Sequence, residues 1–132
     1  MTMQAIVEGV TRVTGVTAVA ILDYDGIPIE THTALGPVNH EHLCAWAAEM
    51  GRRAAGTAEV WEGGPLQVAL FESSMGALML ADVGKGYLMV AGDPTLNSGM
   101  LRLEVERAAE ALRRFLSAGL AVDDPAERAA SA

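Results

Sequence analysis

The stretch Gly15-Val-Thr-Ala-Val-Ala-Ile-Leu-Asp-Tyr-Asp-Gly-Ile-Pro-Ile29 contains two apolar segments separated by Asp25-Gly26. An Asp-Gly pair in this setting is a strong signal for a β-hairpin, because a type I′ turn needs positive φ angles at both central residues. The sequence therefore predicts a strand on either side of a tight Asp25-Gly26 turn, with the second strand reaching about residue 33.

The first of these strands is apolar on both of its faces. Val16, Ala18, Ala20 and Leu22 share one face, and Val19 and Ile21 share the other. An antiparallel strand with one solvated face would alternate between apolar and polar residues, so we expect a central strand with helices on both faces of the sheet. Pro28 removes a hydrogen-bond donor from the second strand, which favours an edge position for it.

The remaining elements follow from apolar periodicity and from Gly and Pro breaks. In chain order we first predict a helix over 3–13, strands over 16–22 and 27–33, and a helix over 40–55 that is capped by Asn39 and ends at Gly56. A strand then begins at 59–61, is interrupted at 63–65 and resumes over 66–72. Strands over 77–83 and 87–91 and a helix over 98–118 complete the predicted domain. This order, α-β-β-α-β-β-β-α, predicts an α+β fold: a single-domain α/β/α sandwich with a five-stranded antiparallel sheet. Residues 1–118 form the predicted domain, and residues 119–132 are predicted to be a disordered tail.

Composition limits the classes of function. The net charge of -8 argues against nucleic acid as a main partner, because phosphate binding draws on Lys and Arg. A single cysteine, Cys44, excludes an internal disulfide. The first 14 residues lack the apolar segment of a signal peptide, and no apolar run approaches the roughly 18 residues of a membrane span. We therefore expect a cytoplasmic protein that does not insert into membranes.

The helix predicted over 40–55 has a wide apolar arc. Helical projection places Leu43, Ala47, Met50 and Ala54 in a stripe toward the core, with Trp46 on one flank and small residues on the other. The whole arc covers roughly 200°, which is more than one sheet face can bury. Either this is an Ala-rich helix that is partly exposed, or it packs both on its own sheet and on a partner helix.

The interrupted strand over residues 59–72 favours the second interpretation. It is rich in apolar side chains, although the turn pattern places it at an end of the sheet, and an apolar unprotected edge invites pairing with another chain. A two-fold dimer that pairs this strand with its mate, and the 40–55 helix with its mate, would cover both surfaces. The predicted dimer interface consists of Ala48, Gly51, Ala55, Val60, Trp61, Leu66 and Val68.

The sequence contains no convincing catalytic, metal-binding or cofactor-binding motif. Gly84-Lys85-Gly86 lies between two predicted strands and opens no helix, so it is a hairpin turn rather than a phosphate-binding loop. His40, His42 and Cys44 cannot converge on one metal ion, because residues two apart on a helix point about 200° apart. We predict no catalytic residue, no metal and no cofactor.

Several segments resemble the roadblock family, which is named after dynein light chains. They are the hairpin Gly15-Val16-x-Ala18-Val19-x-x-x-Asp23-x-Asp25-Gly26-x-Pro28-Ile29, the strand Gly86-Tyr87-Leu88-Met89-Val90, and Asn97-x-Gly99-x-x-Arg102 leading into a helix with Glu106-Arg107-Ala108-Ala109. Together with the element order, the resemblance covers about residues 6–116. It implies a profilin-like fold and a homodimer with a continuous sheet, two antiparallel copies of the 40–55 helix on one face, and the first and last helices on the other.

The resemblance also implies a function as a binding module. Single-domain bacterial and archaeal members are typically associated with a Ras-like small GTPase, and members of the gliding-motility MglB type stimulate GTP hydrolysis without donating a catalytic side chain. We therefore expect a non-enzymatic homodimeric adaptor that binds and regulates such a GTPase. The predicted GTPase-binding face consists of Ala45, Glu49, Arg52 and Arg53.

Three alternatives stay open. Arg52 or Arg53 could reach a phosphate as an arginine finger, although neighbouring helical residues point about 100° apart. The chain could be a structural scaffold subunit with no GTPase partner. It could also be a small-molecule sensor or enzyme, which would require a polar pocket with perturbed ionisable groups.

Overall fold

The computed structural model describes residues 2–33 and 40–118. The elements are α1 (Met3–Thr11), β1 (Val16–Asp23), β2 (Pro28–Thr33), α2 (His40–Val60), β3 (Val68–Ser73), β4 (Gly76–Asp82), β5 (Gly86–Gly92) and α3 (Ser98–Ser117). The predicted element order and fold class are confirmed. The predicted cap Asn39 and the predicted tail over 119–132 lie outside the described residues.

The five strands form one antiparallel sheet in the order β2-β1-β5-β4-β3. The strand β1 lies in the interior of the sheet, as expected from its two apolar faces, and it pairs with β5 in a register that places Ile21 opposite Leu88. The strand β2, which begins at Pro28, is one edge of the sheet, and β3 is the other. The tight turn predicted at residues 84–86 joins β4 to β5.

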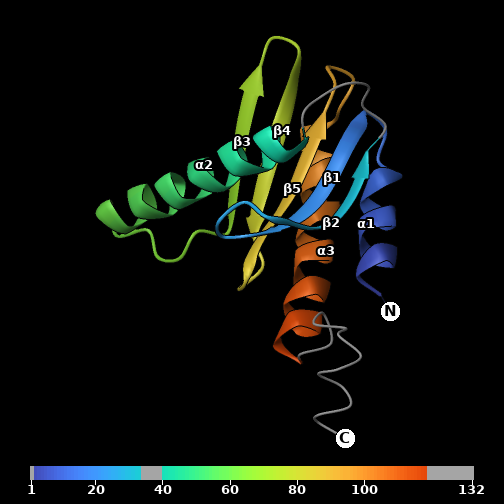
Figure 1. Cartoon of the computed structure of the whole chain (residues 1–132). Helices are drawn as coiled ribbons and strands as arrows, with labels where there is room; N and C mark the ends of the chain where they lie inside the picture. Colours follow the sequence, from blue (N-terminus) through green and yellow to red (C-terminus); the bar gives the residue numbers. More distant parts are fainter. Residues whose placement is uncertain (1, 34–39, 119–132) are drawn as a thin grey trace, which may run out of the picture.

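Two helices cover one face of the sheet, and one helix crosses the other face (Figure 1). On the first face, α1 and α3 bury Val19 and Ile21 of β1. On the second face, α2 packs over Ala20 and Leu22 of the same strand. The two apolar faces of β1 thus set the layering, since each face of this strand belongs to a different apolar cluster.

The helix α3 forms over nearly the predicted range. It begins after Asn97, whose side chain accepts a hydrogen bond from the backbone N–H of Met100, as an N-cap residue does. Its solvated side carries the ion pairs Arg102–Glu106 and Glu110–Arg114. Its buried stripe consists of Leu101, Val105, Ala108, Ala109, Leu112 and Leu116.

The turn between β1 and β2 differs from the predicted type I′ turn. Gly26 has a φ of 88°, whereas Asp25 has a negative φ, so only one residue of the pair is left-handed. The carboxylate of Asp23 accepts hydrogen bonds from the backbone N–H groups of Asp25 and Ile27. The side chain of Asp23 therefore holds a wider turn, in the manner of an Asx turn.

The helix α2 is longer than predicted. It continues through Gly56 to Val60, and the strand predicted over 59–61 does not form. The helix ends in a Schellman motif, in which the N–H of Gly63 donates to the carbonyl of Ala58 and the N–H of Glu62 donates to the carbonyl of Glu59. Glu62 takes the left-handed position of this motif, with a φ of 63°. Because glycine normally fills that position, the sequence around residue 62 does not suggest a helix end.

Candidate protein interface

The edge strand β3 has an apolar, unprotected border. Within the described residues, β3 pairs only with β4, which confirms the prediction that this strand ends the sheet. Ala69 and Phe71 pack with the cluster beneath α2, and Val68 packs with the cluster beneath α3. Leu70 is 40% exposed, and Leu66 is half-buried and precedes the strand. Such an edge presents free backbone donors and acceptors beside apolar side chains, which suits pairing with another strand.

The helix α2 contacts its own sheet through its smallest side chains. Cys44, Ala47 and Ala48 are fully buried there, and burial raises the pKa of the Cys44 thiol. A Cβ atom at Gly51 would lie 2.6 Å from the ring of Tyr87, so the close approach of helix and ring requires glycine. The prediction that Ala48 and Gly51 face a partner helix is therefore wrong, because both lie against their own sheet.

The larger residues of the predicted core stripe lie at the side of α2. Leu43, Met50 and Ala54 are only half-buried, as is Ala55 from the predicted dimer interface. The helix is thus rotated relative to the predicted stripe. The cause is side-chain size: the ring of Tyr87 occupies space that only a glycine on α2 leaves free.

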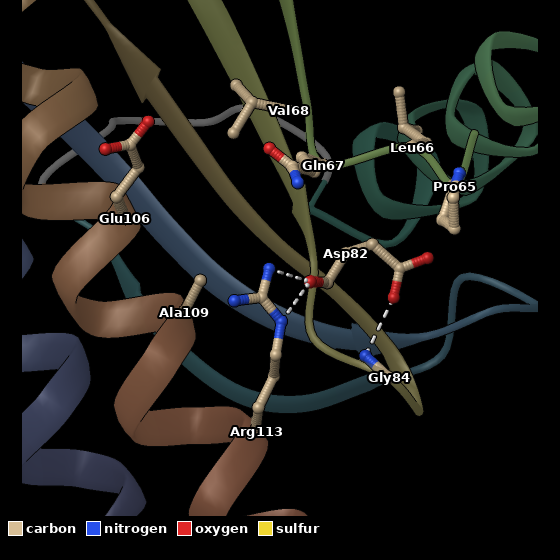
Figure 2. A pocket seen from close by; sticks show the side chains of 9 residues that line it. All are labelled: Pro65, Leu66, Gln67, Val68, Asp82, Gly84, Glu106, Ala109 and Arg113. Atoms are coloured by element: carbon tan, nitrogen blue, oxygen red, sulfur yellow. Dashed lines mark hydrogen bonds between the residues drawn. The ribbon is translucent and has the colours of Figure 1, made fainter. Parts of the chain in front are cut away.

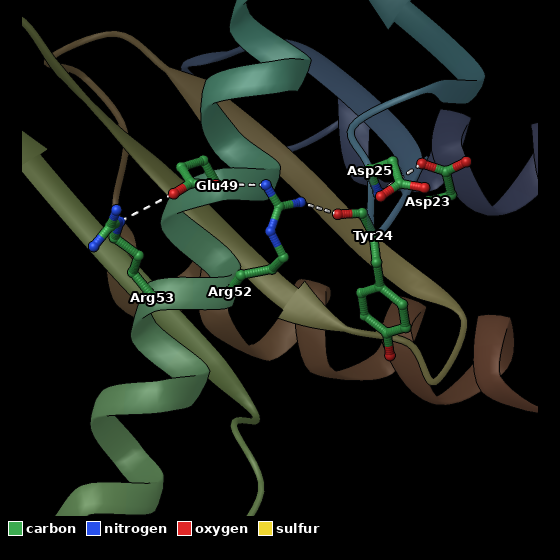
Figure 3. A network of polar contacts seen from close by, with 6 residues as sticks. All are labelled: Asp23, Tyr24, Asp25, Glu49, Arg52 and Arg53. Atoms are coloured by element: carbon green, nitrogen blue, oxygen red, sulfur yellow. Dashed lines mark hydrogen bonds and ion pairs between the residues drawn. The ribbon is translucent and has the colours of Figure 1, made fainter.

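The charged residues of α2 form a network with the β1–β2 turn (Figure 3). Glu49 pairs with both Arg52 and Arg53, and Arg52 also donates a hydrogen bond to the backbone carbonyl of Tyr24. These interactions, that with Arg52 first, lower the pKa of the Glu49 carboxyl. Arg52 therefore fastens α2 to the turn. Arg53 is 81% exposed, and Ala45 is exposed earlier on the same helix.

A second polar contact joins the two turns at this end of the sheet. The hydroxyl of Tyr24 donates to a carboxylate oxygen of Asp82 at 2.9 Å, and the rings of Tyr24 and Tyr87 pack edge to face with centroids 5.1 Å apart. Partial burial, with the hydrogen bond to Asp82, raises the pKa of Tyr24 to about 12. This end of the sheet is therefore held by contacts within the chain.

The end of α2 is apolar and exposed. Val60 is 86% exposed and Trp61, just after the helix, is 69% exposed. Both residues belong to the predicted dimer interface, but they come from a helix end and not from a strand. In residues 52–60 only Ala58 is buried, and Figure 1 shows this part of α2 extending past β3.

A shallow groove lies beside α2 on the same face of the sheet. It has a volume of about 370 Å³, and its walls come from α2, β3, β4 and the turn between the two strands. Its apolar lining consists of Met50, Phe71, Met75, Ala77 and Leu78. Met75, in the turn, is 78% exposed. We call this feature the Met50–Met75 groove.

The opposite face carries a groove of about 380 Å³ beside α3. Figure 2 shows that the guanidinium of Arg113 in its wall donates two hydrogen bonds, of 3.1 and 2.8 Å, to the backbone carbonyl of Asp82. Glu106, another lining residue, pairs with Arg102. These charged groups of the groove are thus committed to partners in the chain.

In the parts of the chain that the structure describes, no cluster of His, Cys, Asp or Glu side chains could hold a metal ion. No helix among the described residues is long and apolar enough to cross a membrane.

The fold and the apolar border can be compared with known proteins. The model of the Roadblock/LC7 domain matches residues 2–93. The chain belongs to the Roadblock/LC7 domain family. The matched residues end before α3, which packs beside α1 in this chain.

Individual proteins and solved structures are similar to this roadblock domain. The uncharacterized protein MJ1340 of Methanocaldococcus jannaschii is 29% identical over 99 residues, which cover 75% of this chain and 86% of that protein. The structure of MglB from Myxococcus xanthus is similar with a TM-score of 0.80 at 19% identity, over 88% of this chain and 95% of that one. The gliding protein MglB from Thermus thermophilus gives a TM-score of 0.76 at 23% identity, over 85% and 86% of the two chains. At these identities the structural likeness shows the fold.

Proposed function

We propose that this roadblock domain is a homodimeric, non-catalytic adaptor that binds and regulates a Ras-like small GTPase. The observation behind the proposal is the joint exposure of an apolar edge strand, β3, and of an apolar helix end that extends past that strand. A GTP-binding partner would place the protein in the cytoplasm.

In the proposed dimer, the β3 edges of two copies pair about a two-fold axis, and the two α2 helices lie antiparallel on one face of the joined sheet. The interface that fits the observed burial keeps Ala55, Val60, Trp61, Leu66 and Val68 from the sequence prediction. It adds Leu70, which is exposed at the edge, and it omits the two residues of α2 that face their own sheet.

The proposed GTPase-binding face is the outward side of α2. Glu49 and Arg53 form an ion pair there, with Arg53 81% exposed, and Ala45 leaves room for close approach. Arg52 would act indirectly, because its guanidinium is held by Glu49 and by the Tyr24 carbonyl. Because these hydrogen bonds hold its guanidinium, Arg52 is a weaker candidate for an arginine finger that contacts a phosphate. Regulation through a change in the conformation of the GTPase is the simpler alternative.

The dimer is tested by Leu70→Asp, which places a charge in the proposed seam. Leu70 is a better choice than Val68, because Val68 packs against its own core. We expect a monomer in analytical ultracentrifugation at micromolar concentration, with an unchanged circular dichroism spectrum. The matched control is Thr31→Asp on β2, the opposite edge, which should leave the dimer intact. A Leu70→Asp protein that sediments as a dimer would place the seam elsewhere.

The GTPase is tested by capture from cell extract loaded with GTPγS or with GDP. We expect the immobilised dimer to retain a small GTPase in one nucleotide state, and Arg53→Glu to abolish that retention. Single-turnover GTP hydrolysis with the purified pair would then distinguish an activator from a passive adaptor. Retention of other proteins regardless of nucleotide would instead favour the scaffold alternative.

A further inference from the structure

The length of α2 beyond the sheet sets what it can reach in a second copy. The apolar cluster beneath α2 includes helix residues only as far as Met50, and Gly51 touches Tyr87. The remaining residues, 52–60, span about 14 Å at about 1.5 Å per residue. Neighbouring strands lie about 4.8 Å apart. Tyr87 lies on β5, two strands inside the β3 edge, so the helix end first crosses its own β4 and β3. If the sheet continues beyond β3 into a second copy, the helix end therefore reaches about one strand of that copy, its β3.

On the face that α2 covers, β3 and β4 carry an open groove in each copy. Phe71 and Leu78 pack at the margin of the cluster beneath α2 and stay half-exposed. Together with Met50 and Met75 they line the Met50–Met75 groove. A two-fold axis at the β3 edge makes the exchange reciprocal: each helix end leaves its own sheet and arrives over β3 of the other copy, which forms one wall of the groove.

We infer that Trp61 at the end of α2 inserts into the Met50–Met75 groove of a second copy, so that two tryptophans clamp the dimer. This inference rests on the proposed homodimer and identifies the surface of the second copy that the end of α2 contacts. The ring of Trp61 lies beside Gly63, where an added Cβ would be 1.9 Å from the indole nitrogen, and the residue is still 69% exposed.

The chemistry of the groove suits an indole. A tryptophan buries roughly 150–250 Å², and the groove offers two thioethers, which make favourable contacts with aromatic rings. The groove is also lined by Ser73, a hydroxyl within the same wall. Large aromatic anchors in such pockets supply much of the affinity of protein interfaces.

The experiment uses Trp61 as its own reporter. In a Trp46→Phe background, Trp61 is the single tryptophan of the chain. We expect its emission maximum to shift to shorter wavelength, and its quenching by acrylamide to fall, as the protein is concentrated from monomer to dimer, with the oligomeric state followed by sedimentation.

Substitutions test the contact from both sides. Trp61→Ala and Met75→Glu should each weaken the dimer at least about tenfold. In the Met75→Glu background, Trp61→Ala should cause little further loss, because the effects of substitutions at two residues in contact do not add. The matched control is Leu103→Ala on α3, which removes another exposed apolar side chain (71% exposed) from the opposite face and should change the dimer constant less than about threefold.

The outcomes separate this inference from the dimer itself. A dimer in which Trp61 stays as exposed as in the monomer, or in which Trp61→Ala has no more effect than Leu103→Ala, overturns the clamp but leaves the homodimer standing. The groove would then be open to a different protein. A chain that stays monomeric up to the highest concentration at which it remains in solution overturns both.

Discussion

At the scale of single residues, the backbone of Glu62 is the clearest source of strain. A left-handed conformation costs a non-glycine residue about 1–2 kcal/mol, whereas glycine adopts it freely. Glycine also adds entropy to the unfolded chain, which offsets part of the gain. We therefore expect Glu62→Gly to raise the free energy of unfolding by about 0.5–1 kcal/mol in urea titrations. Glu59→Gly, in the last turn of α2, is the control and should lower stability by a similar amount.

Tyr24 gives a prediction for alkaline pH. Its pKa is about 12 in the folded chain against 10.0 for the free side chain, so the folded state holds the proton more tightly. The resulting stabilisation is complete below about pH 10 and is lost as the pH rises through about 12. We expect the unfolding free energy to fall more steeply across this pH range in the wild type than in Tyr24→Phe. Part of the fall should remain in the variant, because burial also raises the pKa of Tyr87. Equal slopes for the two proteins would contradict the prediction.

At the scale of elements, α2 contains two glycines in opposite environments. A Cβ atom at Gly56 would meet nothing within 4 Å, whereas one at Gly51 would press into the ring of Tyr87. Gly56→Ala should therefore stabilise the fold by about 0.5–1 kcal/mol through helix propensity. Gly51→Ala should destabilise it by about 1–3 kcal/mol through overpacking. Thermal unfolding of both variants at one protein concentration measures the contrast, and equal effects would mean that α2 does not sit as described.

The order of elements could be predicted because local patterns agree with the fold. The two apolar faces of β1 and the position of Pro28 at the start of an edge strand follow directly from residue type. The end of α2 could not be predicted in this way. Gly56 resembles a helix stop and Val60-Trp61 resembles a strand, while the true cap uses Glu62 in a conformation that its residue type disfavours.

The residues of α2 that face the sheet also could not be predicted from the sequence. Periodicity identifies where apolar residues gather, but Tyr87 leaves no room even for a Cβ atom at residue 51, and the larger Leu43 and Met50 are only half-buried. Small residues therefore define the contact, and the larger ones line the side of the helix. Among the predicted interface residues, those of β3 and of the α2 end, such as Trp61, remain at least partly exposed, and Ala48 does not.

At the scale of the whole molecule, the two faces of the sheet are covered unequally. Two helices lie side by side on one face, and a single helix crosses the other and extends past its edge (Figure 1). A second copy of α2 would complete the thinner layer, so the proposed dimer would add to the stability of a fold that each copy also forms by itself. We therefore expect the melting temperature to rise by roughly 3–5 °C for each tenfold increase in protein concentration, as for cooperative unfolding of a dimer. Leu70→Asp should melt at one temperature across the series, because its unfolding is unimolecular. Differential scanning calorimetry over a roughly 100-fold range of concentration measures both, and a wild-type melting temperature independent of concentration would show that each copy buries its apolar surface alone.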